Sequence, residues 1–134
     1  MQKHLFFLLL LLSSLMCFSQ TKTYQLSSHI LDNSTGQPAS FVLVTLEKMN
    51  EDKTWTKISA KRTNKEGRIT EFLPYQNSNE GVYKLVFDVH SYFESKKIES
   101  FYPFIEIIFS IKGNEHFHVP LTLSPFGYST YKGS

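Results

Sequence analysis

Two histidines near the C-terminal end have the residue type and spacing for proton transfer. Over residues 116–124 polar and apolar residues alternate, which predicts a β-strand with one apolar face and one polar face. Imidazole titrates near neutral pH and can take a proton from water. The polar face of this strand is therefore the first candidate for a site, and it carries His116, His118, Pro120, Thr122 and Ser124.

A third histidine and an arginine lie beside predicted turns. His29 is in a predicted strand that precedes the turn-rich residues 32–38, and Arg68 follows Gly67 in a tight turn. Guanidinium is a fixed planar donor that suits a substrate carbonyl. Taken alone, each residue also fits a structural role, because a strand histidine can make one surface hydrogen bond and a hairpin arginine can be solvated. His90 is interpreted as structural.

The His-x-His spacing at the C-terminal end also raises a zinc hypothesis, with His29 as a third ligand. However, no neighbouring aspartate or glutamate in the motif completes a usual ligand set. A converging Arg68 would also repel the cation. We therefore expect neither a metal nor any other cofactor.

The end of the sequence predicts a hairpin. Residues 124–127 (Ser-Pro-Phe-Gly) have turn chemistry, and residues 128–134 read as a second strand. A hairpin without a polar tail is unusual, because chain termini normally fray into solvent unless they are tied down. We therefore expect residues 131–134 to be in functional use.

The rest of the chain indicates an all-β sandwich. Alternation and β-branched or aromatic residues predict strands at residues 24–31, 41–47, 54–62, 68–72, 82–89 and 104–111. A helical turn is predicted at residues 91–97, with Ser91 as its cap. Short strands at even spacing, without a βαβ rhythm, are typical of a sandwich.

The first 19 residues are typical of a secretory signal peptide, because a charged start at Lys3 is followed by an apolar run and a polar close. The run is short for a membrane anchor. Cleavage after Ser19 would leave one domain, residues 20–134. Lipidation of Cys17 is an alternative that the bulky residues before it disfavour. We expect a secreted or periplasmic protein without stable membrane insertion.

Charge and cysteine content argue against nucleic-acid binding and against disulfide or thiolate metal sites. Without Lys3 the chain carries 13 basic residues against 12 acidic ones, and no basic cluster is present. This balance argues against a nucleic-acid partner, which requires a basic face that matches phosphates. Cys17 is the one cysteine and lies in the predicted signal segment, so the domain has no disulfide or thiolate metal site.

Over essentially its whole mature length the chain resembles the 5-hydroxyisourate hydrolases, the enzymatic branch of the transthyretin-like family. Two features are specific: His-x-Leu-Asp followed by Gly-x-Pro-Ala, and the closing Tyr-basic-Gly-Ser. Hormone-carrying transthyretins share the framework but lack the residues that match His29, Arg68 and His118. The matching segments are LSSHILDNSTGQPA (26–39), TNKEGRI (63–69), VYKLVFDVHSYF (82–93), FYPFIEIIF (101–109) and HFHVPLTLSPFGYSTYKGS (116–134).

The resemblance implies a sandwich of two four-stranded sheets with one short helix, assembled as a homotetramer. The strands that carry His29, His118 and Tyr131 would line a central channel. The implied reaction is hydrolysis of 5-hydroxyisourate to 2-oxo-4-hydroxy-4-carboxy-5-ureidoimidazoline in urate degradation, by water attack on a cyclic amide. The alternative is a non-catalytic ligand-binding or surface sandwich, which predicts no turnover and tolerance of changes at His29 and His118.

The resemblance also implies residue roles. His29, His118 and Arg68 would be catalytic, and Arg68 would also bind substrate. His116 is expected to orient a neighbouring group rather than to act as the base. Lys132 departs from the usual arginine, keeping the charge but losing the bidentate fork, and Thr122 replaces a usual aliphatic residue. Further substrate contacts are expected from Tyr131, Lys132, Gly133 and Ser134.

Overall fold

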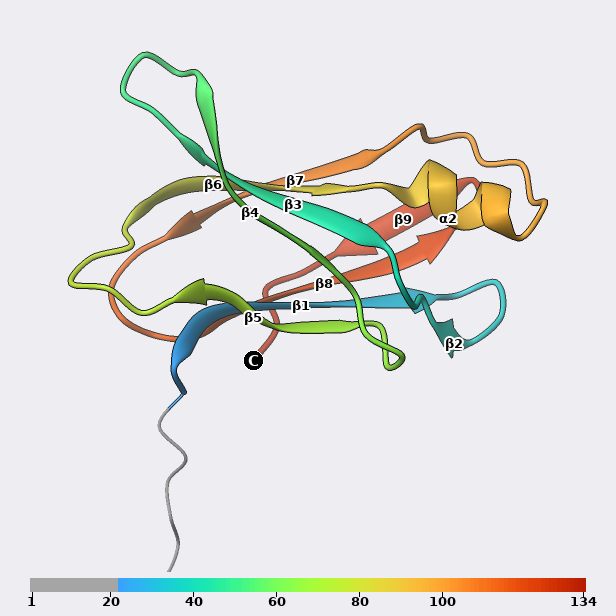
Figure 1. The fold of residues 1–134 in the computed structure, drawn as a ribbon, viewed down its shortest axis with the longest axis horizontal. Coiled ribbons are helices and arrows are strands. Elements are labelled where there is room, and N and C mark those ends of the chain that lie inside the picture. The colour runs from blue at the N-terminus through green and yellow to red at the C-terminus, as the bar shows by residue number, and fades with distance from the viewer. Residues whose placement is uncertain (1–21) are drawn as a thin grey trace, which may run out of the picture.

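The computed structural model describes residues 22–134, so the predicted signal segment, residues 1–19, lies outside the described residues. Two β-sheets pack face to face, with one short helix closing one end of the sandwich (Figure 1). The elements are β1 (Tyr24–Asp32), β2 (Gln37–Pro38), β3 (Leu43–Met49), β4 (Trp55–Arg62), β5 (Arg68–Pro74), β6 (Gly81–Phe87), α2 (Val89–Ser95), β7 (Ile105–Ile111), β8 (Phe117–Ser124) and β9 (Gly127–Thr130).

The predicted sandwich is confirmed. One sheet has the order β4-β3-β6-β7, and the other has the order β2-β1-β8-β9 with β5 also paired to β1. The second sheet has a fifth strand because the two-residue β2 pairs with the end of β1 inside the segment expected to be only a turn. The remaining strand boundaries differ from the predicted ones by a few residues at most, except at β9.

The core lies between the two sheets. The alternation predicted for β8 is confirmed, because Phe117, Val119, Leu121 and Leu123 are all buried. They pack with buried apolar side chains of both sheets and of α2 in one cluster. Each fully buried side chain of this size stabilises the fold by roughly 1.5–3 kcal/mol. The largest fully buried side chains include Tyr83, Phe72, Phe87, Phe93, Leu26 and Ile30.

The helix begins earlier than predicted. Asp88, rather than Ser91, is the N-cap of α2, and its carboxylate accepts a hydrogen bond of 3.2 Å from the Ser91 backbone N–H. The prediction of Ser91 as the cap was wrong because the helix already begins at Val89, so Ser91 lies inside its first turn and donates its own N–H to the cap. Val89 and Phe93 of this helix are buried, so α2 seals the end of the core.

A buried aspartate ties α2 to the end of β1. Asp32 is completely buried, and the Tyr92 hydroxyl donates to its carboxylate at 2.9 Å. The same carboxylate accepts from the Ser34 backbone N–H at 2.9 Å, which shapes the following turn. Burial and the Asp32 carboxylate raise the pKa of the Tyr92 hydroxyl. The aspartate of the His-x-Leu-Asp motif therefore has a structural role, holding the far end of the strand that carries His29.

The last predicted strand, residues 128–134, was too long. The β8–β9 ladder stops at Thr130, opposite Leu121, and the same register resumes only at a bridge between His118 and Gly133. The interruption falls at Pro120, which has no N–H to donate to a facing strand. The Thr130 hydroxyl instead donates to the Pro120 carbonyl at 2.7 Å.

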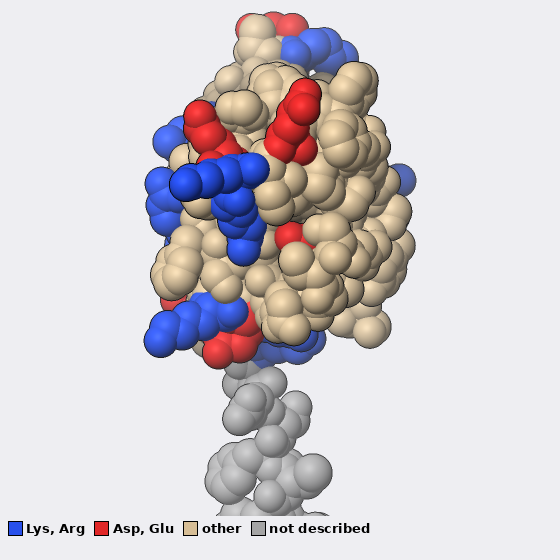
Figure 2. All heavy atoms as spheres, turned by 90° about the vertical axis from the view of Figure 1, so that its right-hand side faces the viewer, with Lys and Arg blue, Asp and Glu red and all other residues tan. Residues whose placement is uncertain are grey.

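The described residues have a mixed surface. Acidic and basic side chains are interspersed on the end of the molecule that carries α2, the face turned toward the viewer in Figure 2. Among residues 22–134 the structure contains no helix that is long and apolar enough to cross a membrane.

Candidate functional site

The centre of the five-stranded sheet positions the candidate residues. β1 and β8 run parallel and adjacent, with Ser27 paired to His118 and His29 paired to Pro120. On the other edge of β1, β5 runs antiparallel and places Arg68 opposite His29. Because β1 alternates, Leu26 and the other core residues point into the sandwich, while Ser27 and His29 point to the outer face.

A close turn sets the position of Arg68. Gly67 has φ +70°, and a Cβ at this position would lie 2.6 Å from the Ile30 carbonyl oxygen, so only glycine fits. The Ile30 backbone N–H donates to the Gly67 carbonyl at 2.9 Å, which fastens the turn onto β1. The Asn64 side chain also accepts from the Arg68 backbone N–H at 2.8 Å. The arginine is therefore fixed at its backbone, while its side chain remains exposed.

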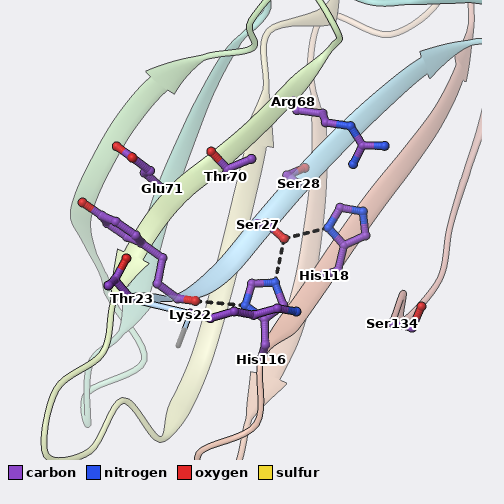
Figure 3. A pocket seen from close by; sticks show the side chains of 11 residues that line it. Lys22, Thr23, Ser27, Ser28, Arg68, Thr70, Glu71, His116, His118 and Ser134 are labelled. Atoms are coloured by element: carbon purple, nitrogen blue, oxygen red, sulfur yellow. Dashed lines mark hydrogen bonds between the residues drawn. The ribbon is translucent and has the colours of Figure 1, made fainter. Parts of the chain in front are cut away.

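A pocket of about 460 Å³ opens on this face of the sheet (Figure 3). Side chains from three strands converge on it: His118 and His116 from β8 and the segment before it, Ser27 from β1, and Arg68 from β5. Ser134 lines the same pocket. His29 does not line the pocket but stands beside it, opposite Arg68.

A hydroxyl connects the two histidines of the His-x-His motif. Ser27 Oγ lies 2.8 Å from Nε2 of His116 and 2.8 Å from Nδ1 of His118 (Figure 3). The other ring nitrogen of His116, Nδ1, lies 2.9 Å from the Tyr24 carbonyl oxygen. Ser27 is 9% exposed, so this hydroxyl depends on these partners rather than on solvent. The prediction that His116 orients a neighbour is consistent with these contacts.

The electrostatics keep both candidate proton-transfer groups neutral. Burial lowers the pKa of His118 below its ordinary value of 6.5, and the nearby charge of Arg68 and of the other histidines lowers it further. Burial and Arg68 likewise lower the pKa of His29, against a backbone hydrogen bond to Glu66. A neutral imidazole has a lone pair available, so each histidine can accept a proton at neutral pH.

The end of the chain packs against the site. The Gly133 backbone N–H donates to the His118 carbonyl at 2.8 Å. A Cβ at Gly133 would lie 2.7 Å from Cδ2 of His118, so the glycine allows the tail to pack against the imidazole edge. This contact brings Ser134 to the pocket. Gly133 and Ser134 are thus next to His118, where substrate contacts were predicted for them.

Lys132 and Tyr131 point elsewhere in this structure. The Lys132 ammonium pairs with Glu115 at 2.9 Å and lies 5.2 Å from the centre of the Phe117 ring. Tyr131 lines a separate groove of about 260 Å³ beside β7, among Ile107 and neighbouring residues. Neither side chain lines the 460 Å³ pocket, but Lys132 and His118 also line this groove, so His118 borders both hollows.

Residue type alone did not identify several pocket residues. Ser27 carried a signal, since it shares a strand face with His29, but a strand serine is too common to predict a role. Thr70 shares the outer face of β5 with Arg68 by the same period and also lines the pocket. Lys22 and Glu71 also line the pocket, and no motif pointed to them.

The zinc hypothesis has no support among residues 22–134. There the structure contains no group of three His, Cys, Asp or Glu side chains arranged to hold a metal ion. The ring nitrogens of His116 and the Nδ1 atom of His118 are instead committed to the Tyr24 carbonyl and to Ser27.

Comparison with known proteins gives a consistent result. A 5-hydroxyisourate hydrolase of Salmonella dublin is 48% identical over 110 residues, covering 81% of this chain and 80% of that protein. A 5-hydroxyisourate hydrolase of Mus musculus is 38% identical over 116 residues, covering 85% and 98%. The probable 5-hydroxyisourate hydrolase R09H10.3 of Caenorhabditis elegans is 43% identical over 117 residues, covering 87% and 86%.

Solved structures show the same fold. The structure of Klebsiella pneumoniae 5-hydroxyisourate hydrolase matches with a TM-score of 0.71 at 35% identity, covering 84% of this chain and 95% of that one. Sea bream transthyretin in complex with thyroxine matches with a TM-score of 0.78 at 31% identity, covering 81% and 94%. The family described as Transthyretin, HIUase/Transthyretin family, matches residues 26–133. Because that match covers most of the chain and includes His29, Arg68 and His118, the chain belongs to the HIUase/transthyretin family.

Proposed function

We propose that this protein is a 5-hydroxyisourate hydrolase that acts in urate degradation. The observation that carries the proposal is the convergence of His29, Arg68 and His118 on one sheet face, with both imidazoles held neutral beside a guanidinium. The relatives that share most of the chain carry this enzyme name. The product of the reaction would be 2-oxo-4-hydroxy-4-carboxy-5-ureidoimidazoline.

The proposed chemistry begins with activation of water. His118 takes a proton from a water molecule, and the resulting hydroxide forms a bond to the carbonyl carbon of the cyclic amide. Negative charge then grows on the carbonyl oxygen. Arg68 is the fixed cation beside both histidines, and it stabilises that charge in the partly dehydrated pocket.

Ring opening completes the proposed reaction. The carbon–nitrogen bond of the intermediate breaks, the nitrogen takes a proton, and the new carboxyl group loses one to become a carboxylate. His29, opposite Arg68, is the second proton-transfer group at this step. Ser134 supplies a polar contact for the substrate ring from the tail. No step requires a metal or an organic cofactor.

We further propose that the active form is a homotetramer with the site in a central channel. Arg68, Thr70 and Ser134 are exposed on the outer face of the sheet in the single chain. A facing subunit would cover this surface and exclude water, which strengthens each electrostatic interaction in the pocket. The strands that carry His29 and His118, together with residues 131–134, would then form the channel wall.

The proposed location is outside the cytoplasm. The charged start, apolar run and polar close of residues 1–19 are typical of a secretory signal peptide, with cleavage after Ser19. The proposal predicts that the protein purified from an exported fraction begins at Gln20. N-terminal sequencing measures this start.

The decisive test of the proposed activity is the absorbance decay of freshly generated 5-hydroxyisourate with and without the purified protein. A faster decay in proportion to protein concentration is expected. The alternative is non-catalytic ligand binding, which the similarity to thyroxine-bound sea bream transthyretin favours as a second candidate. In that case the decay would match the buffer control at every protein concentration, and thyroxine binding by calorimetry would distinguish a carrier.

A further inference from the structure

The hydrogen bonds through Ser27 have a direction that the structure fixes. The chain of contacts begins at the Tyr24 carbonyl oxygen, which can only accept, so Nδ1 of His116 must carry the proton and donate. In neutral His116 the other nitrogen, Nε2, then has a lone pair and no proton. It therefore accepts the hydrogen bond from the Ser27 hydroxyl, 2.8 Å away.

The same direction continues to His118. The Ser27 hydroxyl has one hydrogen and donates it in the hydrogen bond to His116. Ser27 Oγ can therefore only accept from the ring nitrogen on its other side. That nitrogen is Nδ1 of His118, also 2.8 Å away, so Nδ1 carries the proton of the neutral ring. The lone pair is then on Nε2, on the side of the ring turned away from Ser27 and toward Arg68 (Figure 3).

Packing prevents His118 from rotating away from this arrangement. The Cδ2 edge of the ring lies against Gly133, where even one added carbon atom would collide. The Nδ1 edge lies against Ser27, which is directly paired with His118 across the β1–β8 ladder. Both edges of the imidazole are therefore fixed, and the hydrogen bond at Nδ1 decides which nitrogen is free.

We propose that Ser27 is a positioning residue that holds His118 in the Nδ1–H tautomer, so that Nε2 is the atom that takes the proton from water. His116 and the Tyr24 carbonyl set the direction of the Ser27 hydroxyl, and this gives the His-x-His motif its role. The catalytic part of the inference rests on the proposed hydrolase function. The tautomer itself does not, because it follows from the hydrogen bonds alone.

The test is nitrogen-15 NMR of the histidine rings in the purified protein, at a pH where His116 and His118 are both neutral. Signals of His118 are assigned from their loss in His118→Asn. We expect Nδ1 of His118 to be protonated and Nε2 to be bare in the parent. The Ser27→Ala variant is expected to shift His118 toward the Nε2–H form, which is favoured by a free imidazole in water. Ser27→Thr retains a hydroxyl and should retain the parent tautomer.

Ser28 provides a matched control. It is the next residue in β1, it is also buried, and its hydroxyl also bonds to β8, donating to the Val119 carbonyl at 2.8 Å. Ser28→Ala therefore removes a buried serine hydroxyl from the same strand pair without touching His118. It is expected to leave the His118 tautomer unchanged. A shift as large as that of Ser27→Ala would show a general packing effect and would overturn the proposal.

Kinetics test the catalytic part. Loss of one hydrogen bond corresponds to about a tenfold change in the ratio of the two His118 tautomers. Ser27→Ala should therefore lower kcat about tenfold, with KM little changed. An Nε2–H tautomer of His118 in the parent would overturn the proposed role of Ser27 even if hydrolysis were fast. If the parent has the Nδ1–H tautomer but does not hydrolyse 5-hydroxyisourate, the role of Ser27 in setting the tautomer stands and the proposed function is refuted. Full parental kcat in a Ser27→Ala protein with an altered tautomer would refute the catalytic role.

Discussion

At the scale of single residues, substitution of His29 or His118 tests the proposed mechanism most directly. We expect His29→Asn and His118→Asn each to lower turnover of 5-hydroxyisourate by at least ~10²-fold, the scale of a lost general acid or base. The fold should survive, because both side chains lie outside the core. His90→Asn is the control, since His90 is 56% exposed on α2 and remote in the fold. Parental turnover by His118→Asn would contradict the mechanism.

The lowered histidine pKa values predict the acid limb of the pH profile. His118 must be neutral to accept a proton, and its pKa lies below 6.5. Activity should therefore be retained as the pH falls to 6.5 and be lost only at lower pH. The profile of kcat/KM between pH 5 and pH 8 measures this limb.

Substitution of Arg68 tests the cause of the lowered His118 pKa. In Arg68→Gln the repelling charge is gone, so the pKa of His118 should rise. It should not recover fully, because burial is the largest cause of the shift. NMR titration of the His118 ring measures this change without reliance on turnover. A His118 pKa that is unchanged in Arg68→Gln would mean that the two side chains do not interact.

Gly133→Ala tests the contact between the tail and the imidazole. The added Cβ would lie 2.7 Å from Cδ2 of His118, so the tail or the ring must move. We expect activity to fall at least about tenfold through misplacement of the base. Gly127→Ala is the matched control in the same hairpin, because its Cβ would meet only Ser124 Oγ at 3.6 Å. Equal activity of the two variants would show that the tail does not position His118.

His29, Arg68 and His118 could be predicted from residue type, strand parity and the family pattern. Ser27 could not, because its role depends on a hydrogen bond between residues 91 positions apart. Strand periodicity shows which residues share a face but not which strands are neighbours. The ion pair between Lys132 and Glu115 could not be predicted from the sequence either, because an exposed lysine has many possible partners within reach.

At the scale of elements, the tail after β9 should matter to activity more than to stability. Residues 131–134 bury little surface, but Gly133 and Ser134 lie at the site. We expect deletion of these four residues, or a tag after Ser134, to lower activity about 10²-fold. Unfolding free energy should change by no more than about 1 kcal/mol.

A tag ahead of Thr21 is the control for the tagged form, and it should be tolerated. Activity assays and thermal melts of the two tagged proteins separate the effects. Equal activity of both would mean that the tail is not part of the site. The boundary of β9 also shows the limit of pattern-based prediction: alternation continues through residues 131–133, but Pro120 on the facing strand interrupts the hydrogen bonds.

At the scale of the whole molecule, the outer face of the five-stranded sheet predicts assembly. Light scattering should give about four times the mass of the single chain, because a closed symmetric assembly can cover this face in every subunit. A charge placed on it, as in Thr70→Glu, should lower both mass and activity. Ala60→Glu is the control, because Ala60 is exposed on the other sheet. A stable monomer with full activity would contradict the channel.

The parallel pairing of β1 and β8 also determines when activity can appear during folding. Ser27 and His118 are separated by most of the chain, so their contact closes a loop with a large entropy cost. Such contacts form slowly and late compared with the local hairpins β3–β4 and β8–β9. A chain interrupted before β8 would contain most of the strands but would lack His118 and its contact with Ser27. We therefore expect turnover to recover after dilution from denaturant only once β8 has paired with β1.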